Sequence, residues 1–165
     1  KAVLPIVGNG PTNMIPDVTP QEFHLTMDLN VFSAFFTVQK VLPYMAEKSA
    51  IVLISSIAGF QGGSNNIVYN AAKAAVRSMA RSFAGELACK GIRANAISPG
   101  PTETKGFTEF INENDEARNG IIANIPLGHI GQPKEIAAIA LFLASDEASY
   151  VTGAEVIADG GFTNR

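Results

Sequence analysis

Short apolar runs alternate along the chain with longer segments in which apolar residues recur every three or four positions. The short runs predict strands over residues 2–7, 51–54, 92–97 and 154–158. The longer segments predict helices over residues 19–48, 68–89 and 133–145. Strands that alternate with helices in this way are typical of βαβ units, which build a parallel sheet.

Start and stop signals mark the ends of the predicted helices. Thr19-Pro20-Gln21-Glu22 places a threonine at the N-cap, a proline at the first helical position and a glutamate at the third. Pro133 begins the last helix in the same way, and Gly91 follows the second helix as its C′ residue. Pro5 is unusual within a strand because proline donates no ladder hydrogen bond, and Pro43 predicts a bend in the first helix.

Three segments lack a clear period. Residues 8–18 and 57–66 are rich in glycine and asparagine and predict loops, whereas residues 105–125 are more polar and less regular. The sequence contains no internal repeat and no linker, so we expect residues 1–165 to form a single domain.

Composition excludes several classes of protein. Hydrophobic residues make up 47% of the 165 residues and charged residues 16%, which argues against a disordered chain. No apolar run approaches the roughly 18 residues of a membrane span, and no secretory signal is visible, which fits a cytoplasmic protein. The net charge of −3 and the lack of a basic stripe argue against nucleic acid as a partner. One cysteine, Cys89, allows no internal disulfide, and two histidines form no metal-ligand cluster.

Tyr69 and Lys73 stand four residues apart in the second predicted helix, so their side chains share one helical face. An ammonium group near a phenol favours the phenolate and lowers the tyrosine pKa from about 10 toward the working range. A tyrosine tuned in this way acts as a general acid or base. The alternative is an ordinary amphipathic helix with a solvated lysine.

Other polar positions are expected at the carboxyl ends of the strands, where open parallel sheets bind ligands. Ser56 follows the strand 51–54, and its hydroxyl can donate to a carbonyl oxygen, although serine also simply ends strands. The segment Pro99-Gly100-Pro101-Thr102-Glu103-Thr104 follows the third strand. Its glycine lets a ligand approach the backbone and its threonine hydroxyls can bind an amide or phosphate, whereas the alternative is a plain turn. Asn30 lies within a helix, where asparagine is unfavourable without a structural or functional reason.

In combination these segments resemble the short-chain dehydrogenase/reductase family. The resemblance covers residues 17–163 and rests on DLNV with Asn30, IVLISSIAG with Ser56, YNAAK with Tyr69 and Lys73, IRANAISPGPTET, GQPKEIAAIALFLASDEASYVTG and VIADGG. It implies an α/β fold with a Rossmann-like, doubly wound parallel sheet. This chain would hold about four of the usual seven strands, as the catalytic C-terminal part of the fold.

The resemblance also implies catalytic roles. Tyr69 would give a proton to a carbonyl or take one from an alcohol, and Ser56 would orient the substrate oxygen. Lys73 would lower the tyrosine pKa and hold the nicotinamide ribose. Asn30 would hold a water in a proton relay that reaches Lys73. The expected activity is hydride transfer between NAD or NADP and a small alcohol or ketone.

The implied cofactor residues are Tyr69 and Lys73 together with a loop that would pack on the nicotinamide. That loop supplies Pro99, Gly100, Thr102 and Thr104. The segment 105–125 would form a mobile lid over the substrate.

Family members begin with a strand, a glycine-rich TGxxxGxG turn and a helix, which this sequence does not contain. Gly8-Asn9-Gly10 follows a strand, but Pro11 and no helix come next, so we do not interpret it as a dinucleotide fingerprint. Without the preceding strands, the strand 2–7 would become an exposed edge. We therefore expect the chain to be part of a longer protein.

A second hypothesis is a non-catalytic homologue that acts only through association. A flavodoxin-like regulatory domain is disfavoured by the spacing of Ser56, Tyr69 and Lys73. The group Phe32, Phe35 and Phe36 has helical spacing and predicts a core or a helix–helix interface. In the family the two long helices pair across subunits, so we expect a homo-oligomer, either a tetramer or a dimer.

Overall fold

One parallel sheet forms the centre of the computed structural model, which describes residues 1–6, 8–111 and 114–164. Within these residues the strand order is β1-β2-β3-β4, so strands consecutive in sequence are neighbours in the sheet. The strands are β1 Ala2–Val3, β2 Ala50–Ile54, β3 Arg93–Pro99 and β4 Glu155–Ala158. The predicted α/β fold with four parallel strands is confirmed.

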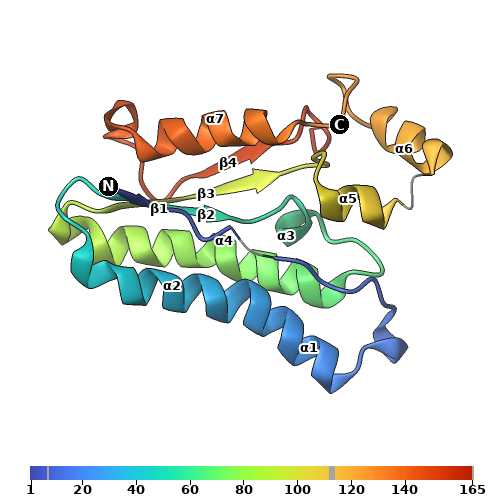
Figure 1. Ribbon diagram of the computed structural model, residues 1–165, viewed down its shortest axis with the longest axis horizontal. Helices are drawn as coiled ribbons and strands as arrows, with labels where there is room; N and C mark the ends of the chain where they lie inside the picture. The colour runs from blue at the N-terminus through green and yellow to red at the C-terminus, as the bar shows by residue number, and fades with distance from the viewer. Residues whose placement is uncertain (7, 112–113, 165) are drawn as a thin grey trace.

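The first strand is shorter than the predicted range 2–7. β1 pairs with β2 only at Ala2 and Val3, and it occupies one edge of the sheet. Pro5 follows closely and cannot donate a ladder hydrogen bond. Beyond β1 the chain runs past the end of β2 toward α1 (Figure 1).

Helices cover both faces of the sheet (Figure 1). α2 and α4 lie on one face and α7 lies on the other, which makes three layers. The helices are α1 Pro20–Met27, α2 Ser33–Val41, α3 Ala58–Gln61, α4 Ile67–Leu87, α5 Lys105–Phe110, α6 Asp115–Ile122 and α7 Pro133–Ala144. None of the helices in the described part of the chain has the length and apolar character needed to cross a membrane.

The side chains of β2 divide the core into two halves. Ile51 and Leu53 are fully buried in a cluster with Val76 of α4. Val52 points to the other face and packs in a cluster with Leu143 of α7. Neighbouring residues of a strand face opposite ways, and each such buried side chain contributes about 2 kcal/mol. The continuous apolar run of β2 is therefore explained by helices on both of its faces.

The helix predicted over 19–48 is divided into several pieces. α1 begins with the predicted capping box, in which Thr19 Oγ1 accepts from the Glu22 amide at 3.2 Å and Glu22 Oε2 accepts from the Thr19 amide at 3.0 Å. After α1, the chain forms a π-helical turn, Asp28–Phe32, before α2 begins. The helical stretch then ends in a 3₁₀ turn, Leu42–Tyr44, instead of bending at Pro43 and continuing to residue 48. Proline lacks the amide that would continue the helix.

Two segments without a predicted helix do contain helices. α3 lies inside the predicted loop 57–66, and α5 and α6 lie inside the irregular segment 105–125. Asparagine and threonine caps explain α5 and α6, because Thr104 Oγ1 and Asn114 Oδ1 each accept from a backbone amide of the first turn. Gly91 adopts the left-handed conformation, with φ 65°, that was predicted for the end of the second helix.

Candidate active site

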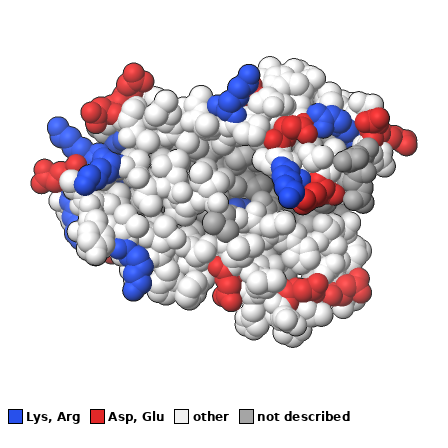
Figure 2. Space-filling model, in the orientation of Figure 1, with Lys and Arg blue, Asp and Glu red and all other residues white. Residues whose placement is uncertain are grey.

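A cavity of about 780 Å³ opens at the carboxyl ends of β2 and β3. Figure 2 shows that this face of the molecule is hollowed and that charged side chains lie mainly around the hollow and at the edges of the face. The predicted site residues that line it are Ser56, Tyr69, Lys73, Pro99, Gly100, Thr102 and Thr104. Asn30 is not among the lining residues, because it is buried directly behind them.

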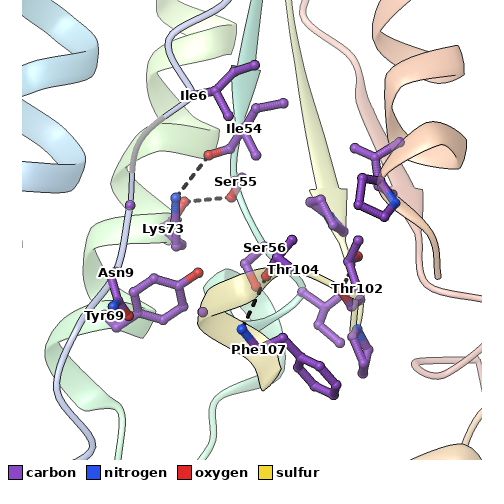
Figure 3. A pocket seen from close by; sticks show the side chains of 18 of the residues that line it. Ile6, Asn9, Ile54, Ser55, Ser56, Tyr69, Lys73, Thr102, Thr104 and Phe107 are labelled. Carbon is purple, nitrogen blue, oxygen red and sulfur yellow. Dashed lines mark hydrogen bonds between the residues drawn. The ribbon is translucent and has the colours of Figure 1, made fainter. Parts of the chain in front are cut away.

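Ser56 is held in a tight turn that follows β2. The Ile57 amide donates to the carbonyl of Pro99 at 3.1 Å, which ties the turn to the end of β3. Ser56 Oγ accepts from the Ala58 amide at 3.2 Å and faces the phenol of Tyr69, whose pKa the serine hydroxyl lowers. The serine hydroxyl is therefore fixed beside the tyrosine hydroxyl at the cavity wall (Figure 3).

Lys73 is buried on α4, one turn after Tyr69. Its Nζ donates to the carbonyl of Ile54 at 3.1 Å and lies 5.5 Å from the centre of the Tyr69 ring. Ser55 Oγ donates to the backbone carbonyl of Lys73 at 2.8 Å, so the end of β2 is fastened to α4 at this point (Figure 3). Burial lowers the pKa of Lys73 from 10.5 to about 8, because the charged ammonium loses its hydration.

Burial raises the pKa of the Tyr69 phenol above its usual value of 10.0, and the hydrogen bond with Ser56 lowers it only in part. The sequence led us to expect a lowered pKa, and this expectation is wrong for the chain by itself. The physical reason is that loss of hydration around the phenolate outweighs the polar neighbours. Tyr69 is therefore protonated at neutral pH and is able to donate.

Asn30 faces the lysine from behind the cavity wall. Its amide Nδ2 donates to the carbonyls of Asn9 and Thr26, each at 2.8 Å. Its Oδ1 is buried and has no hydrogen-bond partner among the described residues. A Cβ on Gly8 would lie 2.3 Å from that oxygen and 2.4 Å from Lys73 Nζ. The two polar atoms thus face the same small space beside Gly8.

The π-helical turn explains how an asparagine inside a helix reaches this position. Asp28–Phe32 is wider than the α-helix on either side, and Asn30 is its central residue. Such insertions are frequent at functional sites. The Asn30 side-chain amide also donates to the carbonyl of Asn9 in the loop after β1. Asn30 therefore connects the π-helical turn with that loop.

The loop after β3 is packed against the last strand. Thr102 Oγ1 donates to the carbonyl of Gly100 at 2.9 Å. A Cβ on Gly100 would lie 2.6 Å from Asp159 Cβ, so only glycine allows the loop to lie this close to the turn after β4. Thr104 lies at the start of α5, where it caps the helix and lines the cavity.

Glu103 connects this loop to α5 and α6. Its Oε1 accepts from Arg118 Nη1 at 3.1 Å and from Thr108 Oγ1 at 3.4 Å. The Arg118 guanidinium lowers the pKa of the Glu103 carboxyl. Both helices of the expected lid are therefore attached to the segment that contains Thr102 and Thr104.

Sequence reasoning missed the part of the site that comes from the loop after β1. Gly8, Asn9 and Gly10 line the cavity, and a Cβ on Gly10 would lie 2.9 Å from Tyr69 Cβ. Two glycines just after a strand are the available signal, but they do not match a dinucleotide fingerprint. Ile136 of α7 and Phe162 complete the opposite side of the cavity.

A four-stranded parallel sheet in this order, with a serine after β2 that faces a tyrosine and a lysine of α4, defines an α/β fold with a candidate site at the carboxyl ends of its strands. Residues 3–163 match the family described as enoyl-(acyl carrier protein) reductase. The chain belongs to the short-chain dehydrogenase/reductase family. Its match lies in the C-terminal portion of that family's members.

Individual relatives carry several oxidoreductase names. The chain is 41% identical over 143 residues to 3-oxoacyl-(acyl-carrier-protein) reductase of Thermotoga maritima, which covers 86% of this chain and 57% of the relative. It is 39% identical over 152 residues to L-rhamnose-1-dehydrogenase of Scheffersomyces stipitis, covering 88% of this chain and 57% of the relative. The chain thus spans a little over half the length of these curated relatives.

Solved structures share the fold closely. A short-chain dehydrogenase/reductase of Brucella melitensis, described as glucose/ribitol dehydrogenase, superimposes with a TM-score of 0.92 at 32% identity, over 98% of this chain and 64% of that one. ElxO with NADP bound superimposes with a TM-score of 0.90 at 26% identity, over 99% of this chain and 67% of that one.

Proposed function

We propose that this chain is the catalytic C-terminal part, in one domain, of an NAD(P)-dependent oxidoreductase acting on an alcohol or ketone. Three polar groups, the Tyr69 phenol, the Ser56 hydroxyl and the Lys73 ammonium, converge at one wall of a single cavity, and this convergence carries the proposal. The oxidoreductase names of the relatives support the reaction class.

Tyr69 and Ser56 act on the substrate oxygen. Both hydroxyls face the cavity, and two donors that converge on a carbonyl oxygen stabilise the charge that develops there during reduction. Because burial keeps the phenol protonated, Tyr69 gives its proton to that oxygen when a ketone is reduced. In the oxidation of an alcohol the same groups work in reverse.

Lys73 and Asn30 return the proton to Tyr69. The ammonium lies over the tyrosine ring and shares a small space with Asn30 Oδ1. With a pKa of about 8, Lys73 loses and regains a proton close to neutral pH. Asn30 Oδ1 accepts from a water in this space, and that water passes protons to and from the lysine.

The residues of the loop after β3 fit a nicotinamide cofactor. Tyr69, Lys73, Thr102 and Thr104 line the cavity, and their hydroxyl and ammonium groups are the kind of polar partners that a ribose and an amide-bearing ring require. Tyr69 and Lys73 would hold the ribose, and Pro99, Gly100, Thr102 and Thr104 would contact the ring. When bound, NAD or NADP supplies or accepts the hydride.

Replacing the proposed proton donor tests the activity directly. In the full-length protein, assayed with a panel of alcohols and ketones, Tyr69→Phe should lower kcat by about a thousandfold, the order that general acid catalysis contributes. The affinity for NADH or NADPH, measured by fluorescence titration, should stay within about twofold, because Lys73 and the loop after β3 remain. Tyr44→Phe is the matched control, since Tyr44 is 79% exposed in the 3₁₀ turn that follows α2.

Retained turnover in the Tyr69→Phe variant contradicts the proposed role. Absence of cofactor binding and of turnover in the full-length protein, with intact folding, favours the second hypothesis of a homologue that acts only by association.

We further propose that the protein forms a homo-oligomer through α1 and α2. Several large apolar side chains on this side are exposed, namely Leu25, Leu29, Phe32 and Phe35. Exposed apolar groups that lie together indicate a surface covered by a partner.

A further inference from the structure

α3 carries the turn that begins at Ser56, and it rests on α4 at two points. A Cβ on Gly59 would lie 2.9 Å from the backbone nitrogen of Ala74, so the two backbones already touch there. At the next position the guanidinium of Arg77 lies over the ring of Phe60, 5.5 Å from its centre. This distance is within the range of a favourable cation–π contact.

Arg77 is itself held in place by a residue of the sheet. Its Nε donates to a carboxylate oxygen of Glu155 at the start of β4. The Glu155 side chain is only 11% exposed, and its other oxygen accepts from Ser98 Oγ of β3 at 2.7 Å. Arg81 lies 4.0 Å from the same carboxylate, but its side chain is 60% exposed. The guanidinium over Phe60 is therefore held by Glu155 of β4, and that carboxylate is in turn held by Ser98 of β3.

Ser56 is positioned from two directions. The Ile57 amide binds the carbonyl of Pro99 on one side. On the other side the Ser56 carbonyl accepts from the Gly59 amide at 3.0 Å, which bonds Ser56 to the first turn of α3. A shift of α3 relative to α4 therefore moves the serine relative to Tyr69, which belongs to α4.

We propose that Phe60 and Arg77 are positioning residues that keep the Ser56 hydroxyl beside the Tyr69 phenol. The inference rests on the proposed function, in which these two hydroxyls bind the same substrate oxygen. Lysine cannot replace the arginine, because only the planar guanidinium covers an aromatic ring while it donates to a carboxylate.

The test uses the titration of Tyr69 without any cofactor. The chain has three tyrosines and no tryptophan, so Y44F and Y150F leave Tyr69 as the only strong near-ultraviolet chromophore. Tyrosinate absorbance is read within milliseconds of a pH jump, before alkaline unfolding begins. In this background F60A and R77K are compared with R81K. R81K is the matched control, because it leaves the contact between Arg77 and Phe60 in place.

F60A and R77K should raise the titration midpoint of Tyr69 by up to about one pH unit, toward the midpoint of S56A, because they weaken a hydrogen bond to the phenolate. R81K should leave it unchanged. In the S56A background, F60A and R77K should cause no further rise. If the shifts appear only when Ser56 is present, F60A and R77K act through Ser56 and not through a general destabilisation of the fold.

An unchanged titration midpoint of Tyr69 in both F60A and R77K overturns the inference. Equal shifts of that midpoint in the Ser56 and S56A backgrounds overturn it as well. F60L keeps the measurement possible if F60A or R77K folds poorly, and its circular dichroism is compared with that of the unaltered chain. The proposed function fails separately, through absent turnover or cofactor binding in the full-length protein, and neither result depends on this titration.

Discussion

Lys73 carries an ammonium group into a site that is 3% exposed, and within the described residues its Nζ has one hydrogen-bond acceptor, the carbonyl of Ile54. In the unfolded chain the same group is hydrated and titrates at 10.5, whereas burial lowers the pKa of Lys73 to about 8 in the folded chain. Between these two pH values the unfolded chain binds more protons. Folding therefore becomes more favourable as the pH rises through this window.

The Lys73→Met variant should be more stable than the unaltered chain at pH 7. The burial cost is fully present below about pH 8, and it amounts to roughly 3 kcal/mol, less about 1 kcal/mol for the lost hydrogen bond. The difference in the free energy of unfolding should shrink as the pH approaches 10.5. Urea unfolding at several pH values measures it, with exposed Lys40→Met as the control.

A stability difference that does not depend on pH contradicts this account of Lys73. A buried ionisable group that lowers the stability of the fold and has a shifted pKa is expected at a functional site. Tyr69 shows the same conflict, because burial raises its pKa and keeps its proton in place until a substrate oxygen arrives.

At the scale of secondary-structure elements, Glu103 joins α5 and α6 to the loop after β3 through Arg118 and Thr108. The Glu103→Gln variant should release these helices and increase limited proteolysis within them by about fivefold. This factor corresponds to a partly exposed ion pair of about 1 kcal/mol. The increase should be smaller at high salt, where the ion pair of the unaltered chain is already screened.

Glu109→Gln provides the matched control for this prediction. Glu109 pairs with Lys105 at 3.8 Å, but both side chains are largely exposed and connect only neighbouring turns of α5. Equal cleavage of the Glu103 and Glu109 variants, or cleavage outside these helices, contradicts the proposed connection.

Elements with strong local signals could be predicted from the sequence. The apolar run of β2, the capping box at Thr19 and the left-handed Gly91 each depend on a few neighbouring residues, and the structure confirms all three. The shortness of β1 depends on Pro5 and on pairing with a distant strand. The π-helical turn at Asn30 depends on a hydrogen bond to Asn9, which no local pattern indicates.

In the candidate site, too, the features that depend on local sequence were predictable, and those that depend on distant residues were not. Tyr69 and Lys73 share one helix, so their spacing predicts a common face, and Ser56 follows from the end of a strand. The direction of the tyrosine pKa shift depends on how much water the surrounding layers exclude, which spacing does not reveal. The role of Gly8 depends on its distance from Asn30 and Lys73, which lie on two other elements.

At the scale of the whole molecule, we predict that the chain associates through α1, the π-helical turn and α2. Phe32 is 56% exposed and packs against Phe36 with ring centres 4.1 Å apart, so a charge at this position disrupts the apolar surface. Light scattering after size exclusion should show a dimer or tetramer, and Phe32→Glu should shift it to the monomer. Leu141→Glu tests the other exposed apolar face, on α7, where Leu141 is 72% exposed.

A monomeric unaltered chain contradicts this prediction. Dissociation by Leu141→Glu alone places the interface on α7 instead of α1 and α2. Both outcomes leave the convergence of Ser56, Tyr69 and Lys73 unaffected, because these residues lie in the cavity and not on either face.

The cavity combines Leu4 from just after β1, Tyr69 from the middle of the chain and Phe162 from just after β4. No single hairpin or helix pair encloses it, so it exists only when all layers have docked, and contacts this distant in sequence slow folding. A molecule that occupies the cavity binds the native state and not partly folded chains. The thermal unfolding midpoint of the protein should therefore increase with the logarithm of the ligand concentration. A screen of thermal unfolding against candidate compounds can therefore identify the substrate.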